Sequence, residues 1–177
     1  MKYNNFLFKF LIVIAWIIFV GLSIEACALL VNFIFTFFNP AVLKNLYQKL
    51  DLSAMYNRST ATFYSMYTFI LVIAFFKAAL FYEVIKLVSK LDLDRPFSSF
   101  VSKKITSISY ITFMIGLVSI AARQTADNLS HKGYDVNMLN EFWVDSNAYI
   151  LMAAVIYTIS IIFKRGIELQ NENDTTI

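Results

Sequence analysis

Two charged residues inside long apolar runs are the first candidates for chemistry. Glu25 and Lys77 each stand in a stretch that is otherwise almost free of charge. A charged side chain at the centre of a membrane-spanning helix costs about 2.5–3.5 kcal/mol on insertion scales, so each needs a partner or a polar pocket. We favour the hypothesis that Glu25 and Lys77 form an intramembrane ion pair that locks neighbouring helices. Separate structural roles and a proton or ion relay stay open as alternatives.

A second group of reactive residues lies between the third and fourth apolar runs. The single histidine, His131, is surrounded there by carboxylates at Asp127, Asp135, Glu141 and Asp145. One imidazole with scattered carboxylates is more often a solvated loop than a metal site. The sequence also contains no Gly-rich phosphate loop, no His-Glu-x-x-His and no paired-cysteine motif. We therefore expect no catalytic residues, no metal site, no cofactor and no enzymatic activity.

The composition indicates a membrane protein. Of 177 residues, 59% are hydrophobic and 15% are charged, whereas a typical soluble domain has about 25% charged residues. A soluble protein of this length has too little interior to bury so much apolar surface. Lys and Arg stand at the ends of the apolar runs, which favours membrane flanks over direct nucleic-acid binding.

Four apolar runs are long enough to cross a bilayer as α-helices, which takes about 20 residues each. The predicted spans are residues 10–38, 63–88, 105–122 and 142–163. Together they make residues 1–177 a single membrane domain. Apolar residues at helical spacing after Pro40 predict a short amphipathic helix on the outer surface. Small and hydroxyl residues such as Ser109 and Gly116 predict close packing of the third span.

The basic residues set the expected orientation. Residues 89–104, between the second and third spans, carry Lys90, Arg95, Lys103 and Lys104. If both termini lie inside, nine basic residues face the cytoplasm and five face outward, with Lys77 left in the membrane. Cytoplasmic loops carry an excess of Lys and Arg, so we expect the N-in/C-in topology, with the inverted one left open. Residues 89–104 are then a cytoplasmic hinge and residues 164–177 a cytoplasmic tail.

Two short motifs resemble those of a known family. The tail reads RGIELQNENDTTI from Arg165 to Ile177, and the hinge contains Pro96-Phe97-Ser98. Both resemble motifs of a bacterial family of small four-span membrane proteins, domain of unknown function 2975. The resemblance implies a multi-pass protein of the bacterial inner (cytoplasmic) membrane, often encoded beside a small helix-turn-helix regulator. The candidate recognition residues are Arg95, Pro96, Phe97, Ser98, Arg165, Gly166, Glu168, Gln170, Glu172, Asn173 and Asp174.

These observations predict an all-α four-helix transmembrane bundle with a non-enzymatic role. The function we expect is that of a sensor or regulatory partner that presents its hinge and tail to a cytoplasmic protein such as that regulator. One alternative is a small transporter or ion-coupled carrier that uses Glu25 and Lys77. Another is a membrane immunity or stress-protection protein. The lipid bilayer is the expected environment, and a homo-oligomer is left open.

Hinge and tail also have a purely structural interpretation. The tail acids Glu168, Glu172 and Asp174 would then pair with basic residues of the hinge. Their expected partners are Arg95, Lys103 and Lys104.

Overall fold

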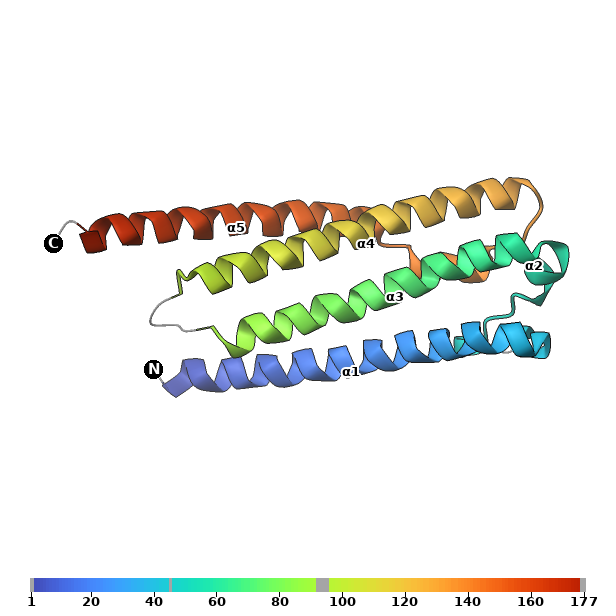
Figure 1. Ribbon diagram of the computed structural model, residues 1–177, viewed down its shortest axis with the longest axis horizontal. Coiled ribbons are helices and arrows are strands. Elements are labelled where there is room, and N and C mark those ends of the chain that lie inside the picture. Colours follow the sequence, from blue (N-terminus) through green and yellow to red (C-terminus); the bar gives the residue numbers. More distant parts are fainter. Residues whose placement is uncertain (1, 45, 92–95, 176–177) are drawn as a thin grey trace.

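The computed structural model describes residues 2–44, 46–91 and 96–175. Four long helices dominate it (Figure 1). They are α1 (Lys2–Phe38), α3 (Thr60–Ser89), α4 (Ser99–His131) and α5 (Ser146–Thr175). Each is long and apolar enough to cross a membrane, and the described residues contain no strand. The prediction of an all-α four-helix transmembrane bundle is confirmed.

The helices extend beyond the predicted spans because their ends depend on caps as well as on apolarity. The Ser59 hydroxyl accepts a hydrogen bond from the Thr62 backbone N–H (3.3 Å), so α3 begins at Thr60. Residues predicted as a separate tail continue α5 to Thr175. The fourth helix in turn begins at Ser146, later than predicted, because Asn137–Phe142 forms the short 3₁₀ helix η3.

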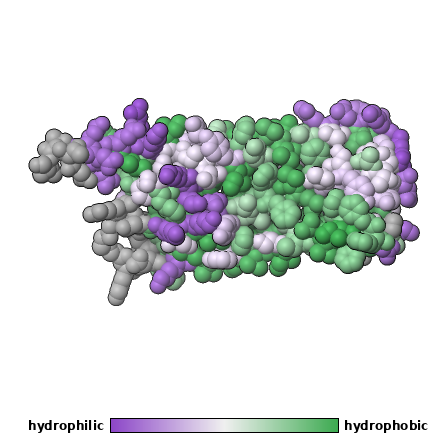
Figure 2. Space-filling view, in the orientation of Figure 1, coloured by the Kyte–Doolittle hydropathy of each residue, from purple (hydrophilic) through white to green (hydrophobic). Residues whose placement is uncertain are grey.

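The helices pack in chain order. α1 packs on α3, α3 on α4, and α4 on α5, so α1 and α5 form the two edges (Figure 1). The two central helices bury more of their apolar surface than the edge helices. Figure 2 shows an apolar band across the middle of the molecule with hydrophilic residues gathered at both ends. This distribution is expected of helices that cross a bilayer.

Polar side chains and one glycine bring the helices close together. The buried Tyr67 hydroxyl of α3 donates to the Leu29 carbonyl of α1 (3.1 Å), and the Ser109 hydroxyl of α4 donates to the Ala153 carbonyl of α5 (3.0 Å). Gly116 lies so near α5 that an added Cβ would be 2.6 Å from Ile150 Cδ1. The predicted close packing of the third span is therefore found in the structure.

The two ends of the bundle differ. The hinge end contains the start of α1, the end of α3, the start of α4 and the end of α5 (Figure 1). The opposite end, the cap end, consists of residues 39–44, 46–59 and 132–145. Its short helices are η1 (Pro40–Lys44), η2 (Tyr47–Lys49), α2 (Ser53–Arg58) and η3.

The first half of the cap replaces the single amphipathic helix predicted after Pro40. Backbone N–H groups of Leu46 and Leu52 donate to the carbonyls of Leu50 (3.0 Å) and Leu43 (3.1 Å), which folds the segment onto itself. These four leucines are buried in the core of the bundle. Their apolar side chains thus pack against protein instead of a bilayer surface. Outside this core, hydrogen bonding by the Ser53 hydroxyl and backbone N–H holds the pKa of Asp51 below its usual range.

Arg58 joins the two halves of the cap. Its guanidinium donates to the carbonyls of Gly133 and Lys132 (2.8 Å each) and lies 4.1 Å from the centroid of the Tyr134 ring. Gly133 has φ +78°, a left-handed conformation that glycine adopts without strain. Charge-assisted hydrogen bonds of this kind are stronger than neutral ones.

Replacing Arg58 with methionine is expected to loosen the cap without unfolding the bundle. The change removes both charge-assisted bonds and the cation–π contact, at a cost of about 1–3 kcal/mol. Amide hydrogen exchange over residues 132–136 is expected to rise in Arg58→Met while exchange in α3 and α4 stays the same. Lys132→Met is the control, since that position offers Arg58 only its backbone carbonyl. Equal exchange in the two variants would show that the Arg58 side chain does not hold the two halves of the cap together.

Candidate functional site at the hinge end

The two family-like motifs meet at the hinge end. Phe97 lies directly over Gly166 of α5, where an added Cβ would be 2.6–3.1 Å from three of its ring atoms. The same ring packs against Phe163, with centroids 5.3 Å apart. Only a residue without a side chain allows this approach. The structure therefore unites the Pro-Phe-Ser motif and the tail motif in one surface.

Local chemistry positions each half of this surface. Ser98 accepts a hydrogen bond from the Val101 backbone N–H (3.3 Å) and caps α4, so the motif sits at the start of that helix. The described part of the tail motif belongs to α5, which ends at Thr175. Phe97 is 41% exposed and Leu169 is 63% exposed, although both are large apolar side chains.

The remaining predicted site residues fall into two groups. Pro96, Gln170 and Glu172 are described, Glu172 exposed and the other two partly buried. Arg95 and the side chains of Asn173 and Asp174 lie outside the described residues.

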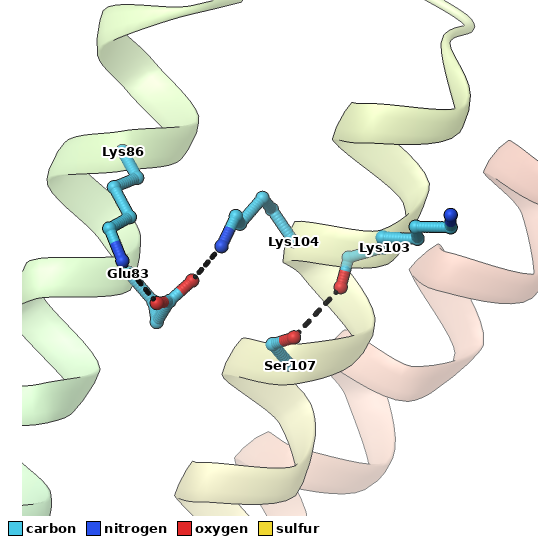
Figure 3. Close-up of polar contacts among 5 residues, drawn as sticks. All are labelled: Glu83, Lys86, Lys103, Lys104 and Ser107. Atoms are coloured by element: carbon cyan, nitrogen blue, oxygen red, sulfur yellow. Dashed lines mark hydrogen bonds and ion pairs between the residues drawn. The ribbon is translucent and has the colours of Figure 1, made fainter.

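A three-residue ion cluster also lies at the hinge end, where it joins α3 to α4 (Figure 3). Glu83 of α3 accepts from Lys86 of the same helix (3.0 Å) and from Lys104 of α4 (2.6 Å). The Glu83 side chain is 15% exposed and that of Lys104 is 23% exposed. Lys86 also lies over the Tyr82 ring, 3.9 Å from its centroid. The cluster therefore bridges the two helices where the hinge joins them.

The sequence itself contains a signal for this cluster. Glu83 stands six residues before the end of α3, and Lys104 stands five residues after the start of α4. Two antiparallel neighbours joined by a short hinge bring such positions to the same level. Glu83 and Lys86 are also spaced as helical neighbours, three residues apart.

Of the structural pairings predicted for the tail acids, the one involving Glu168 is not found. Glu168 pairs with Arg165 on the same helix (3.1 Å), and Lys104 pairs with Glu83. The proposed pairings of Glu172 and Asp174 with the hinge, and any pairing with Arg95, stay predictions.

The Glu25–Lys77 ion pair is not formed in the structure. Neither residue has an ion-pair partner in the part of the chain that the structure describes, and both are partly buried. The register of the hairpin gives a reason. Leu29 contacts Tyr67 and Phe19 contacts Tyr82.

Those two contacts place the charges at different heights. Glu25 is closer in sequence to Leu29, and Lys77 is closer to Tyr82, so the Lys77 position lies nearer the hinge end. The structure therefore favours separate roles over a locking pair. A carrier that depends on joint action of Glu25 and Lys77 gains no support from this geometry.

The reactive residues predicted between the third and fourth spans are spread over the last turns of α4 and the cap end. His131 ends α4, and its side chain is exposed, as are those of Asp127, Asp135, Glu141 and Asp145. Among the described residues, no three histidine, cysteine or carboxylate side chains come close enough to hold a metal ion.

Four long apolar helices with folded polar ends define a multi-span helical membrane protein. The model of the family described as "Protein of unknown function (DUF2975)" matches residues 45–177, about three quarters of the chain. The chain belongs to this family, and the resemblance seen in the hinge and tail motifs is confirmed. No curated protein and no solved structure matches the chain.

Proposed function

We propose that this protein is a non-enzymatic regulatory partner of a bacterial inner membrane, with the hinge end in the cytoplasm. The contact of Phe97 with Gly166 carries the proposal, because it joins both family motifs in one solvent-facing surface. Residues that only stabilise a bundle need no exposed apolar side chains beyond the membrane. Phe97 and Leu169 are such side chains, and exposed apolar residues at a rigid site favour protein recognition.

The charge distribution supports the orientation. Eight described basic residues lie at the hinge end: Lys2, Lys9, Lys86, Lys90, Lys103, Lys104, Lys164 and Arg165. Five lie at or near the cap end: Lys44, Lys49, Arg58, Arg123 and Lys132. An excess of Lys and Arg is the signature of the cytoplasmic side.

The tail suits a basic partner. Glu168 and Glu172 are exposed on the last turns of α5, which extends past the basic residues Lys164 and Arg165. DNA-binding proteins present basic faces, so a small helix-turn-helix regulator is the partner class that we propose. Capture at the membrane would keep such a regulator from its DNA.

In-cell crosslinking of the tagged protein tests this proposal. Removing the chain after Arg165 would also delete Gly166 and disturb Phe97, so a point substitution is the sharper test. We expect Leu169→Asp to abolish capture of a helix-turn-helix regulator identified by mass spectrometry. The control is Met138→Asp, which places the same charge on an exposed apolar residue of the cap end.

The outcomes separate the alternatives. Capture by the unmodified protein and by Met138→Asp, but not by Leu169→Asp, would support recognition at the hinge end. Equal capture by a folded Leu169→Asp variant would show that the tail is not part of the binding interface. If the unmodified protein captures no cytoplasmic protein, the proposal fails. The contact between hinge and tail then only stabilises the bundle.

A further inference from the structure

An open, apolar groove runs between α4 and α5. It has a volume of about 350 Å³ and is lined mainly by apolar atoms. Phe113 of α4 and Ile150 of α5 form its walls, and the small side chain of Ala154 leaves space between them. This volume lies within the range of about 300–1,000 Å³ that is usual for small-molecule sites.

Two tyrosines of the groove have unused hydroxyl groups. Tyr110 and Tyr157 come from opposite walls, with ring centroids 6.3 Å apart, and are 59% and 44% exposed. Neither hydroxyl has a hydrogen-bond partner within the described chain. A hydroxyl without a partner in a hydrocarbon environment is costly. The groove therefore offers two donors to an acceptor group of a bound molecule.

Two lysines stand above these tyrosines on the same faces of the two helices. Lys103 precedes Tyr110 by seven residues, and Lys164 follows Tyr157 by seven residues. Seven residues are about two helical turns, so each lysine lies on the face of its tyrosine, about 10 Å nearer the hinge end. Lys103 points away from Glu83, on the side of α4 where α5 lies (Figure 3). Lys164 is exposed and has no polar contact within the described chain.

We propose that this groove binds one anionic glycerophospholipid of the hinge-end leaflet. Along both helices the order is ammonium group, phenol hydroxyl and apolar wall, going into the bilayer. A phospholipid presents the matching order of phosphate, ester carbonyls and acyl chain. Its phosphate contacts Lys103 and Lys164, its ester carbonyls accept hydrogen bonds from the tyrosines, and one acyl chain lies along Phe113 and Ala154.

The lipid class follows from the chemistry of the groove. Free phosphate would leave the apolar walls and the tyrosine hydroxyls unused. A zwitterionic phospholipid fits the same walls, but its headgroup carries a positive charge near both lysines. Basic groups at the inner end of membrane helices attract anionic headgroups.

Lipid retention during purification tests the site. The full-length protein is equilibrated in detergent with equal amounts of phosphatidylglycerol and phosphatidylcholine that carry identical acyl chains. Native mass spectrometry then measures the bound amount of each lipid. We expect the unmodified protein to retain phosphatidylglycerol preferentially. The double variant Lys103→Gln/Lys164→Gln is expected to lose this preference by on the order of tenfold.

Two further variants distinguish the contribution of the lysines, which bind the headgroup, from that of the groove, which binds the acyl chain. Lys9→Gln/Lys90→Gln removes the same charge from exposed positions of the hinge end outside the groove, and it should keep the preference. Ala154→Phe fills the groove from an exposed position and should reduce retention of both lipids. Ala154→Leu serves if the phenylalanine variant does not fold, as judged by its thermal unfolding.

The proposal would be overturned by any of three results. One is an unmodified protein with no preference for phosphatidylglycerol. Another is an equal loss of preference in the two lysine pairs, which would show general attraction to the leaflet. The third is unchanged retention in a folded groove-filled variant.

Discussion

Replacing Gly116 with alanine is expected to lower the free energy of unfolding by about 1–3 kcal/mol, the usual cost of overpacking a close-packed interior. The new Cβ would lie 2.6 Å from Ile150 Cδ1, 2.9 Å from Cγ1 and 3.1 Å from the Ile150 backbone nitrogen. The side chain of Ile150 has some freedom to move, but its backbone moves only with α5. The clash therefore separates α4 from α5 or forces Ile150 out of its preferred conformation.

A second glycine provides the matched control. Gly21 also lies inside a spanning helix, but an added Cβ there meets no atom within 4 Å. Alanine is the better helix former by about 1 kcal/mol, so Gly21→Ala is expected to be neutral or stabilising. Unfolding in mixed micelles with increasing sodium dodecyl sulfate measures both variants. Adding Ile150→Val, which removes Cδ1, should restore part of the loss in Gly116→Ala. Equal behaviour of the two glycine variants would rule out the close contact.

Replacing Glu83 with glutamine is expected to cost about 2 kcal/mol of unfolding free energy. The change leaves Lys86 and Lys104 beside each other without a counter-charge. Removing one partner of a fully buried ion pair costs about 3–5 kcal/mol, and partial exposure of these side chains reduces that figure. The exposed pair Arg165–Glu168 is the comparison, because its side chains are 77% and 46% exposed. Glu168→Gln is expected to change stability by less than about 0.5 kcal/mol.

A double-mutant cycle separates the bridge from other effects of Glu83. In Glu83→Gln/Lys104→Gln the unpaired ammonium of Lys104 is also gone, so the double variant should be more stable than the sum of the single losses predicts. The same unfolding assay gives all four values. Additive losses would show that Glu83 and Lys104 act independently, and the bridge between α3 and α4 would then contribute nothing measurable.

The four spans were predictable because lipid imposes one simple requirement. A helix that crosses a bilayer needs about 20 apolar residues, and apolarity is a property of the sequence alone. The helix ends were less predictable, since they depend on single capping residues such as Ser59 and Ser98. The cap end was least predictable. Its leucines have helical spacing, but they turn inward because the bundle offers a better apolar surface than the lipid headgroups.

The candidate site was likewise predictable only in part from the sequence. Sequence motifs pointed to the hinge and the tail separately, and the structure showed that Phe97 and Gly166 are in contact. Glu83, Lys86 and Lys104 were visible as charges near span ends. Their pairing depends on the register of α3 against α4, which no local pattern specifies. The same dependence explains why Glu25 and Lys77 were predicted to pair and do not.

By itself the sequence determined that this is a four-span helical membrane protein, which end of it is basic, and that its hinge and tail carry the motifs of its family. Each of these properties is local or additive along the chain. Only the tertiary structure decided which charges pair, at which glycines two helices come into close contact, and which lysines and tyrosines share one groove. Those outcomes depend on helix rotation and register, where a shift of one residue turns a side chain by about 100° and changes its neighbours.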